Sequence, residues 1–303
     1  MSDEPFRLLS LDGGGIRGLF SAAFLAHIEE HTGKRFADHF HLITGTSTGA
    51  VIALGLASGM SATEVLRFYQ EHGEAIFSRG RGVSQLFRPK YDNQRLIEAL
   101  QDVFGEQTLN DLKVPVAIAS YELVQGIPRV FKDDHHANLH WGGGLPVWKV
   151  AAASSAAPLF FPPVQVQGHD NHIDGGIWAN NPIMVGLTEA VRYFDRRLDD
   201  VLALSIGTGT QAFRLDRQGA TGFGLLGWLQ DKRIVNAVFD AQSQSAHYSA
   251  KLLLSPDRYV RVDADLSSSI PLDNYRAALP LIERGMHAGR MHKNDIEQRF
   301  LNG

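Results

Sequence analysis

The sequence contains no cysteine among its 303 residues. This absence excludes disulfide bonds, thiolate metal ligands and a cysteine nucleophile within the chain. Long hydrophobic runs are also lacking, because the longest apolar stretch, about residues 50–60, is interrupted by glycine and is too short to span a bilayer. Neither sign of charge dominates. The formal net charge of -4 gives no electrostatic reason to expect a nucleic acid polymer as partner, or a general attraction to anionic surfaces.

The overall composition is that of a globular protein, with 44% hydrophobic and 20% charged residues. The opening residues, MSDEPF, are acidic and lack the basic and apolar stretches of a signal peptide, so we expect a soluble cytoplasmic protein. The length fits one large α/β domain, and no repeat, low-complexity segment or linker divides it. We therefore expect residues 1–303 to form a single domain.

Short apolar runs alternate with segments of helical spacing along the chain. The pattern predicts strands at Arg7–Leu11, His41–Gly45, Val114–Tyr121 and Val201–Gly207. It predicts helices at Gly18–His31, Thr48–Ser58, Ser61–Ala75, Pro146–Ala153, Pro182–Arg192, Gly222–Leu254 and Asp273–Phe300. Arg79–Arg95 is predicted to be a polar loop at the rim or lid of a site. The alternation favours a three-layer α/β/α fold with a mainly parallel central sheet.

A G-x-S-x-G motif, Gly45-Thr-Ser47-Thr-Gly49, lies between a predicted strand and a predicted helix. A nucleophilic serine must project from a sharp strand-to-helix turn, and glycines on either side let the two backbones pass closely. The motif therefore makes Ser47 a candidate nucleophile, with Gly45 and Gly49 as the glycines of its turn. The alternative is a tight structural corner with a buried serine.

The stretch Asp12-Gly-Gly-Gly-Ile-Arg-Gly18 directly follows the first predicted strand. The backbone N–H groups of Gly13, Gly14 and Gly15 carry no side chain in their way, and such groups can stabilise an oxyanion. Arg17 could steady either this loop or the anion.

The same stretch also matches G-x-G-x-x-G, the dinucleotide-binding fingerprint, between a strand and a helix. That fingerprint also requires an acidic residue at the end of the next strand. Here that strand ends in Thr44-Gly45-Thr46-Ser47, which contains no carboxylate. A dinucleotide-binding module without ester hydrolysis is one alternative reading of the stretch, and a purely structural turn is another.

Asp174 precedes two glycines, and Asn180-Asn181-Pro182 follows shortly after. An Asp-Gly-Gly stretch alone usually forms a turn. A serine nucleophile needs a base within reach, however, and flexible glycines would let the Asp174 carboxylate approach one. The serine motif follows only the second strand, which argues against an α/β-hydrolase, where the motif comes late and an acid and a histidine follow.

These motifs together resemble the patatin-like phospholipase family. The resemblance consists of DGGGIRG, GTSTG about thirty residues later, Ser154–Pro158 with Phe160–Pro163, and DGG followed by NNP. It covers about residues 6–209, and 210–303 are expected to form a helical C-terminal part. It implies a serine acyl hydrolase in which Ser47 attacks an ester of a glycerophospholipid or lysophospholipid and Asp174 takes its proton. Gly13, Gly14 and Gly15 would hold the oxyanion, and no metal or cofactor is implied.

The resemblance extends to bacterial effectors that a cyclic nucleotide activates in antiphage defence. It therefore leaves open a cyclic dinucleotide activator, although no motif identifies a nucleotide pocket. The implied partner is a phospholipid membrane surface, reached by peripheral contact. Phe223–Leu229, which is apolar and interrupted by glycine, could insert at that surface or cover the acyl groove. It could equally belong to the core or to a homo-oligomer contact.

Histidines suggest two further alternatives. His169-Asp170-Asn171-His172 lies just before Asp174, and could indicate a metal site or a third catalytic residue at His172. Because this stretch reads as a loop, we expect its side chains to be solvated loop residues, as at His135 and His136. No metal site is predicted.

Overall fold

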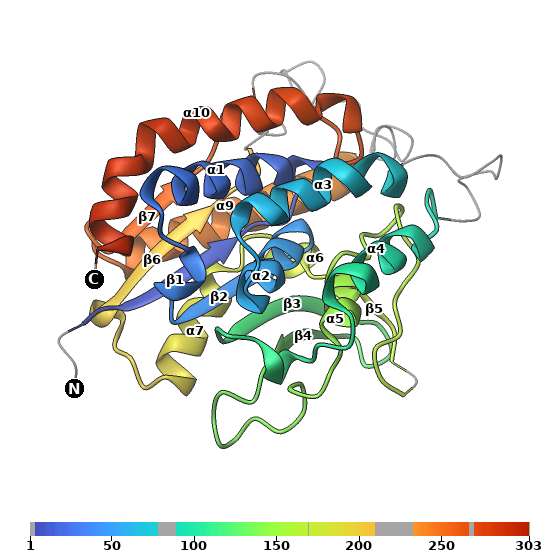
Figure 1. The fold of residues 1–303 in the computed structure, drawn as a ribbon. Helices are drawn as coiled ribbons and strands as arrows, with labels where there is room; N and C mark the ends of the chain where they lie inside the picture. Colours follow the sequence, from blue (N-terminus) through green and yellow to red (C-terminus); the bar gives the residue numbers. More distant parts are fainter. Residues whose placement is uncertain (1–3, 78–88, 169, 210–232, 267–269, 303) are drawn as a thin grey trace, which may run out of the picture.

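One mixed β-sheet runs through the residues that the computed structural model describes, which are 4–77, 89–168, 170–209, 233–266 and 270–302 (Figure 1). Its strands in chain order are β1 (Phe6–Leu11), β2 (Leu42–Thr46), β3 (Val116–Glu122), β4 (Ile127–Lys132), β5 (His172–Asp174), β6 (Val201–Ile206) and β7 (Tyr259–Val262). The order across the sheet is β4-β3-β2-β1-β6-β7, and β5 pairs with β3 off this path. The pairs β3–β2, β2–β1, β1–β6 and β6–β7 are parallel, whereas β4 and β5 run antiparallel to β3. The predicted mainly parallel central sheet is confirmed.

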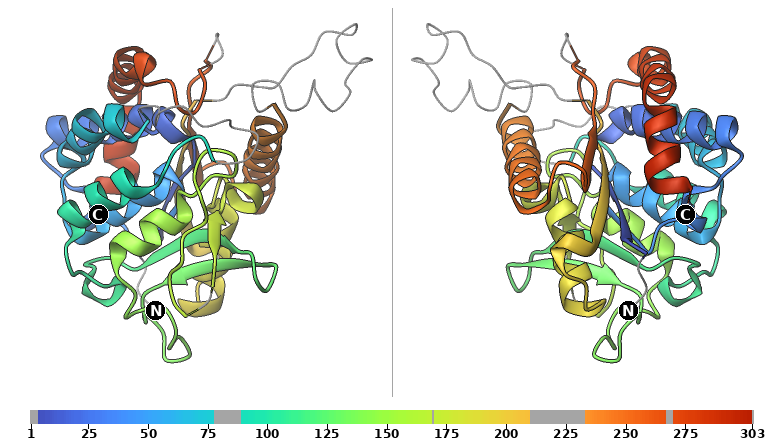
Figure 2. Two further views of the ribbon diagram at one scale, coloured as in Figure 1. Left: turned by 90° about the vertical axis from the view of Figure 1, so that its right-hand side faces the viewer. Right: turned by 90° about the vertical axis from the view of Figure 1, so that its left-hand side faces the viewer.

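Helices cover both faces of the sheet, which gives the predicted three layers (Figure 2). The helices in chain order are α1 (Gly18–Thr32), α2 (Thr48–Ser58), α3 (Ala62–Ile76), α4 (Gln94–Phe104), α5 (Val147–Ser154), α6 (Gly176–Ala179), α7 (Ile183–Tyr193), α9 (Arg233–Leu253) and α10 (Ala278–Ile296). On one face α1 packs against α10 and α3, while α7 and α9 pack together on the other.

The central strand β1 is buried along its whole length, as expected for a strand with helices above and below it. Leu9 and Leu11 belong to the core beneath α1 and α2, whereas Phe6 and Leu8 belong to the second core beneath α7. This two-sided burial explains why the strand appears in the sequence as an unbroken apolar run.

Most predicted elements occur within two residues of their expected bounds. The capping box at Ser61 is present, because the Ser61 side chain accepts a hydrogen bond from the backbone of Glu64 and the Glu64 side chain accepts one from Ser61. The C-terminal helices appear as α9 and α10, and α10 continues as a π-helical turn to Leu301. Phe223–Leu229 and the first part of the predicted helix at Gly222–Leu254 lie outside the described residues.

The sequence pattern did not predict α4, α6, β4, β5 or β7. Helix α4 buries Leu96, Leu100 and Phe104 at helical spacing, and it begins at Gln94, so the predicted loop at Arg79–Arg95 extends too far. Residues 78–88 of that loop lie outside the described ranges.

The prediction of a loop before Asp174 is wrong for His172–Asp174. These residues form β5, which pairs with β3 so that Asp174 lies opposite Ser120. A strand of three residues is too short to show a periodic pattern, so the sequence alone did not reveal it.

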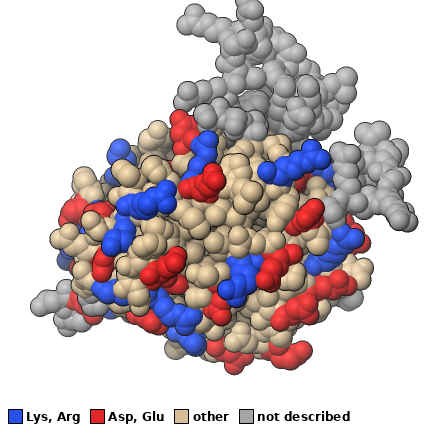
Figure 3. Space-filling view, turned by 45° about the horizontal axis from the view of Figure 1, so that its top comes forward, with Lys and Arg blue, Asp and Glu red and all other residues tan. Residues whose placement is uncertain are grey.

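Charged side chains of both signs are interspersed on the face shown in Figure 3 and do not gather there into a patch of one sign. The near balance of acidic and basic residues in the sequence is therefore also found on this face. The described residues on this face therefore do not provide the strong basic field that attracts anionic lipid.

Candidate active site

The topology brings the predicted site residues to one edge of the sheet. The triple-glycine loop follows β1 and Ser47 follows β2, and these strands are parallel neighbours, so both segments emerge at their carboxyl ends. Asp174 reaches the same place from β5, because β3 pairs with β2 on one side and with β5 on the other.

Ser47 occupies a strained turn between β2 and α2. Its φ of 55° and ψ of -124° lie in a region that residues other than glycine rarely adopt. The Ser47 N–H donates a hydrogen bond to Ser154 Oγ (2.9 Å), and Ser154 Oγ donates to the Ala119 carbonyl (2.7 Å). The surrounding structure thus holds the serine in this conformation, from which its side chain projects at the start of a helix.

Gly45 and Gly49 allow helix α2 to lie close to β2 and to the end of β1. A Cβ atom at Gly45 would lie 2.4 Å from the Gly49 carbonyl oxygen, and one at Gly49 would lie 2.2 Å from the Leu11 carbonyl oxygen. Both contacts are with backbone atoms that cannot rotate away, so neither position accepts a side chain without movement of the strands.

Asp174 is completely buried at the end of β5. Its Oδ1 accepts a hydrogen bond from the Gly176 N–H (2.7 Å). Burial raises the pKa of Asp174 to about 7 from an ordinary value of 3.8, and the Ser47 hydroxyl and the Gly176 N–H offset part of that rise. Oδ2 has no partner in hydrogen-bond geometry among the described residues, so the Ser47 hydroxyl is near the carboxylate without a fully formed bond.

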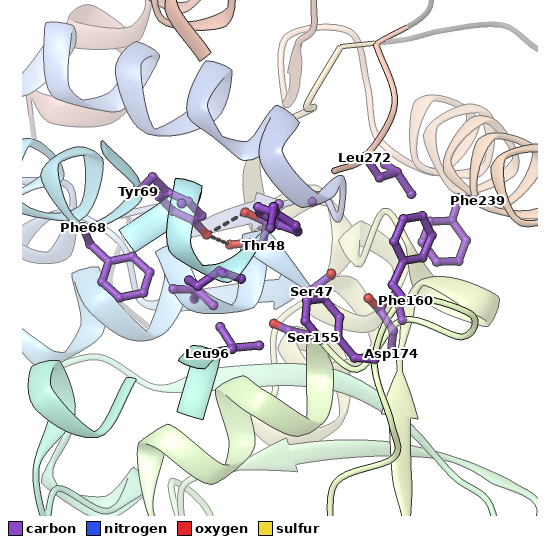
Figure 4. Close-up of a pocket in the computed structure, with 17 residues that line it drawn as sticks. Ser47, Thr48, Phe68, Tyr69, Leu96, Ser155, Phe160, Asp174, Phe239 and Leu272 are labelled. Atoms are coloured by element: carbon purple, nitrogen blue, oxygen red, sulfur yellow. Dashed lines mark hydrogen bonds between the residues drawn. The ribbon is translucent and has the colours of Figure 1, made fainter. Parts of the chain in front are cut away.

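Ser47 and Asp174 line one cavity of about 630 Å³, part of which is open to solvent (Figure 4). Apart from a few hydroxyl and backbone groups, its lining is aliphatic and aromatic: Val51, Phe68, Tyr69, Ile76, Phe77, Leu96, Phe160, Phe161, Phe239 and Leu272. A cavity of this size with little polar surface accommodates a long apolar group. We call it the acyl cavity below.

The triple-glycine loop lies beside this cavity, and its three N–H groups differ in availability. The Gly13 N–H donates to the Asn180 carbonyl oxygen (2.9 Å), whereas those of Gly14 and Gly15 have no partner among the described residues. Gly15 lines the acyl cavity with Ser47 and has a positive φ of 56°. The donors free to meet an oxyanion in this structure are therefore Gly14 and Gly15, while Gly13 anchors the loop.

Arg17 steadies the loop rather than facing Ser47. Its Nε donates to the Gly14 carbonyl oxygen (3.3 Å), and the residue is 8% exposed. Burial lowers the pKa of the guanidinium, although Asp240, Asp263 and Asp12 lie near enough to oppose that shift. The Arg17 side chain does not line the acyl cavity but a second one, which is polar.

Comparison with known proteins identifies the family. The profile of the family described as patatin-like phospholipase matches residues 9–187, more than half of the 303-residue chain. The chain belongs to the patatin-like phospholipase family. The resemblance inferred from the motifs is confirmed, and this membership places the protein among the lipid acyl hydrolases.

Two bacterial relatives share most of their length with this patatin-like protein. A cGAMP-activated phospholipase of Vibrio cholerae is 34% identical over 307 residues, covering 90% of this chain and 86% of that protein. A cGAMP-activated phospholipase of Escherichia coli is 34% identical over 306 residues, covering 90% and 85%. The crystal structure of VipD from Legionella pneumophila is similar with a TM-score of 0.53, covering 96% of this chain and 67% of that one. At 14% identity, VipD supports the fold alone.

An ion-pair network that the sequence did not reveal fixes the start of the glycine loop. Arg261 on β7 donates to both carboxylate oxygens of Asp12 (2.8 and 2.7 Å), to Asp263 (2.7 Å) and to Ser205 Oγ (2.8 Å). Burial raises the pKa of Asp12 to about 6 even though Arg261 lowers it. An Arg-x-Asp spacing on an unpredicted strand gave no signal of this contact.

His172 is part of the scaffold of this patatin-like domain. Its Nε2 lies 2.9 Å from Asp170 Oδ2, and its ring packs on Phe131 with centroids 4.9 Å apart. The side chain is fully buried and does not line the acyl cavity, so the expectation of a solvated residue is wrong. His135 is likewise not a solvated loop residue, because Asp133 and Glu189 flank its ring and raise its pKa to about 9 against the effect of burial.

The described residues contain neither a cluster of metal-ligating side chains nor a membrane-spanning helix. Within those ranges, no three His, Cys, Asp or Glu side chains come together in a way that could hold a metal ion. In the same part of the chain, no helix combines the length and the apolar character needed to cross a membrane. His169 lies outside the described residues.

Proposed function

We propose that this protein hydrolyses fatty-acyl esters of glycerophospholipids or lysophospholipids through a Ser47–Asp174 dyad. The observation that carries the proposal is a serine on a strained strand-to-helix turn that shares an apolar cavity with a buried carboxylate of raised pKa. Perturbed pKa values of this kind concentrate at catalytic sites. The family supplies the reaction class, and the cavity supplies a place for the acyl chain.

The first step is attack of Ser47 Oγ on the ester carbonyl carbon. Asp174 takes the hydroxyl proton as the new C–O bond forms, and the N–H groups of Gly14 and Gly15 donate to the developing oxyanion. The tetrahedral intermediate then collapses, the bond to the alcohol oxygen breaks, and Asp174 returns the proton to the leaving alcohol. The products are an acyl-serine and the deacylated glycerol derivative.

Water completes the reaction. Asp174, ionised again, takes a proton from water as the water oxygen attacks the acyl-serine carbonyl carbon. The bond to Ser47 Oγ breaks, Oγ recovers the proton from Asp174, and a free fatty acid leaves. One water is consumed in each cycle, and no other co-reactant is needed.

The raised pKa explains how a dyad without histidine can act. An aspartate with an ordinary pKa is a weak base toward a hydroxyl, whereas a carboxylate with a pKa of about 7 holds a proton more strongly and is still about half ionised at neutral pH. Desolvation in the apolar cavity is the physical source of the added basicity.

The alternative function, dinucleotide binding at the G-x-G-x-x-G loop without hydrolysis, has less support. The cavity beside Gly15 is apolar and contains a buried carboxylate, and a pyrophosphate would be repelled there. The second strand ends at Thr46 and is followed by Ser47, and neither residue supplies a carboxylate for a ribose hydroxyl.

We further propose that a cyclic dinucleotide activates the enzyme, as the names of the Vibrio cholerae and Escherichia coli relatives state for those proteins. Substrate would be taken from a membrane surface by peripheral contact, and the antiphage role implied by the resemblance would follow from loss of the cell's own phospholipid. Residues 1–303 would act as one patatin-like domain, alone or as a homo-oligomer. The 90% coverage of this chain by the two relatives supports the single domain.

The decisive experiment is labelling with a fluorophosphonate ester followed by peptide mass spectrometry. We expect a covalent adduct on Ser47 in the wild type and none in Ser47→Ala, with loss of fatty-acid release from phospholipid vesicles in Ser47→Ala and Asp174→Asn. Full vesicle hydrolysis by folded Ser47→Ala would exclude this mechanism. Saturable dinucleotide binding by that same fully active variant would favour the alternative.

A further inference from the structure

A second cavity adjoins the acyl cavity, and Phe239 on α9 lines both. It has about 650 Å³ of empty space, part of it open to solvent. Its other lining residues are mostly charged or hydrogen-bonding, in contrast to the apolar lining around Ser47. We call it the polar cavity. The mechanism proposed above makes no use of it.

Arg17 is the feature of the polar cavity that indicates a ligand. The residue is more than nine-tenths buried, and its side chain forms one hydrogen bond, from Nε to the Gly14 carbonyl oxygen. Its two terminal nitrogens have no hydrogen bond or ion pair with any described residue. The guanidinium interacts electrostatically with nearby carboxylates, but its planar fork lines the polar cavity without a hydrogen-bonded partner among the described residues, so a group that accepts hydrogen bonds from the fork would be bound there.

The charges around Arg17 limit which anion fits. Arg261, the second cation of the cavity, is already engaged by Asp12 and Asp263. Asp240 on α9 also lies close enough to act on Arg17 electrostatically. These carboxylates would repel a phosphomonoester with two charges more than a phosphodiester with one, because repulsion grows with the charge of the ligand. A phosphodiester also offers two unesterified oxygens in the spacing that a guanidinium recognises.

The polar cavity is mechanically linked to the oxyanion donors. Asn180 lines it, accepts from the Gly13 N–H (2.9 Å) and donates through Nδ2 to the Gly13 carbonyl oxygen (3.4 Å). Thr208 lines it and donates to the same oxygen (2.9 Å). Arg17 itself holds the Gly14 carbonyl oxygen. A ligand that forms hydrogen bonds with Arg17 would therefore change the position of the loop that carries the Gly14 and Gly15 N–H groups.

We propose that the polar cavity binds a phosphodiester on Arg17, and that its occupancy sets the position of the triple-glycine loop. The regulatory half of this inference rests on the proposed acyl-hydrolase function. The phosphodiester has two sources: the proposed cyclic dinucleotide, or the headgroup linkage of the phospholipid. The experiment separates them and measures binding without catalysis.

The test uses the full chain with Ser47→Ala, so that binding is read independently of ester cleavage. Calorimetric titrations measure cyclic GMP–AMP and, separately, glycerophosphoethanolamine, a soluble headgroup phosphodiester. Gln244→Glu adds one negative charge on α9 at the exposed rim of the polar cavity, with almost no change of volume. Ser245→Glu adds the same charge to the next residue, which is exposed and does not line the cavity, and is the matched control.

We expect one of the two probes to bind, with Kd raised about fivefold by Gln244→Glu and at least tenfold by Arg17→Gln, and unchanged within twofold by Ser245→Glu. Binding of cyclic GMP–AMP with this pattern assigns the cavity to the activator, and activation of vesicle hydrolysis should shift by the same factor in Gln244→Glu. Binding of glycerophosphoethanolamine alone assigns the cavity to the substrate headgroup. In that case the Gln244→Glu variant should show a raised KM for phospholipid hydrolysis without a change in kcat.

The proposal is overturned if neither probe binds, or if Gln244→Glu leaves Kd unchanged for a probe that does bind. Gln244→Glu keeps the test valid even if Arg17→Gln fails to fold. Hydrolysis and Ser47 labelling by the wild type are measured separately, so this failure leaves the proposed activity standing.

Discussion

Ser154 supports the backbone of Ser47 directly: the Ser47 N–H donates to Ser154 Oγ at 2.9 Å, and the same Oγ donates to β3 at the Ala119 carbonyl. One completely buried hydroxyl thus ties the strained turn of the candidate nucleophile to the neighbouring strand. It belongs to the Ser/Ala/Pro stretch that contributed to the family resemblance, and this contact gives that stretch a physical role.

Ser154→Ala should therefore weaken both the fold and the activity. The change leaves the Ser47 N–H without its partner and removes the hydrogen bond to the Ala119 carbonyl, which costs about 1–3 kcal/mol of unfolding free energy, and it loosens the Ser47 turn so that kcat falls. Urea unfolding and vesicle hydrolysis measure the two effects. Ser155→Ala is the control, because the buried Ser155 Oγ has no partner and its loss should cost little stability. Equal destabilisation by the two variants would contradict the role of Ser154.

Asp174→Asn should abolish ester turnover and yet stabilise the protein above pH 7. The pKa of Asp174 is raised in the folded state, so the folded protein binds more protons than the unfolded chain between about pH 4 and pH 7. The contribution of the Asp174 carboxyl group to the free energy of unfolding is therefore fully present below about pH 4 and is lost as the pH rises to about 7. At pH 8 the variant, which buries no charge there, should be more stable by about 2–4 kcal/mol. Thermal melts of both proteins at pH 5 and pH 8 check this, and a smaller advantage for the variant at pH 8 than at pH 5 would be inconsistent with it.

The pH dependence of catalysis should report the same carboxyl group. Because the base form is required, kcat/KM for a soluble ester should rise about tenfold per pH unit below pH 7 and level off above it. An unperturbed aspartate would instead give a plateau that begins near pH 5. A rate profile measured with a substrate that does not itself titrate in this range distinguishes the two cases.

Gly49→Ala should disrupt the turn through a steric clash. The added methyl group would lie 2.2 Å from the Leu11 carbonyl oxygen and 2.6 Å from that of Asp12, so β1 and α2 would have to separate. We expect a loss of more than about 3 kcal/mol of stability, or no soluble protein. Gly144→Ala is the matched control, because open space surrounds that position. Near-wild-type stability of Gly49→Ala would show that the two backbones need not pass as closely as they do here.

The sequence by itself determined the class of fold and the position of the candidate nucleophile turn. Buried strands such as Phe6–Leu11 are continuous apolar runs because helices cover both faces, and the turn at Ser47 needs glycines at fixed spacing because backbones meet there. Both signals depend on neighbours along the chain, which is what a sequence pattern records.

Only the tertiary structure decided how distant groups meet. Asp174 came beside Ser47 through β5, a three-residue strand with no periodic signal, and its pKa depends on burial by segments far away in the chain. The engagement of the Gly13 N–H by Asn180, and the contact of Arg261 with Asp12, likewise join residues more than 160 positions apart. Desolvation and long-range hydrogen bonds are properties of the packed chain, so they decide which of the expected groups remain available at the site.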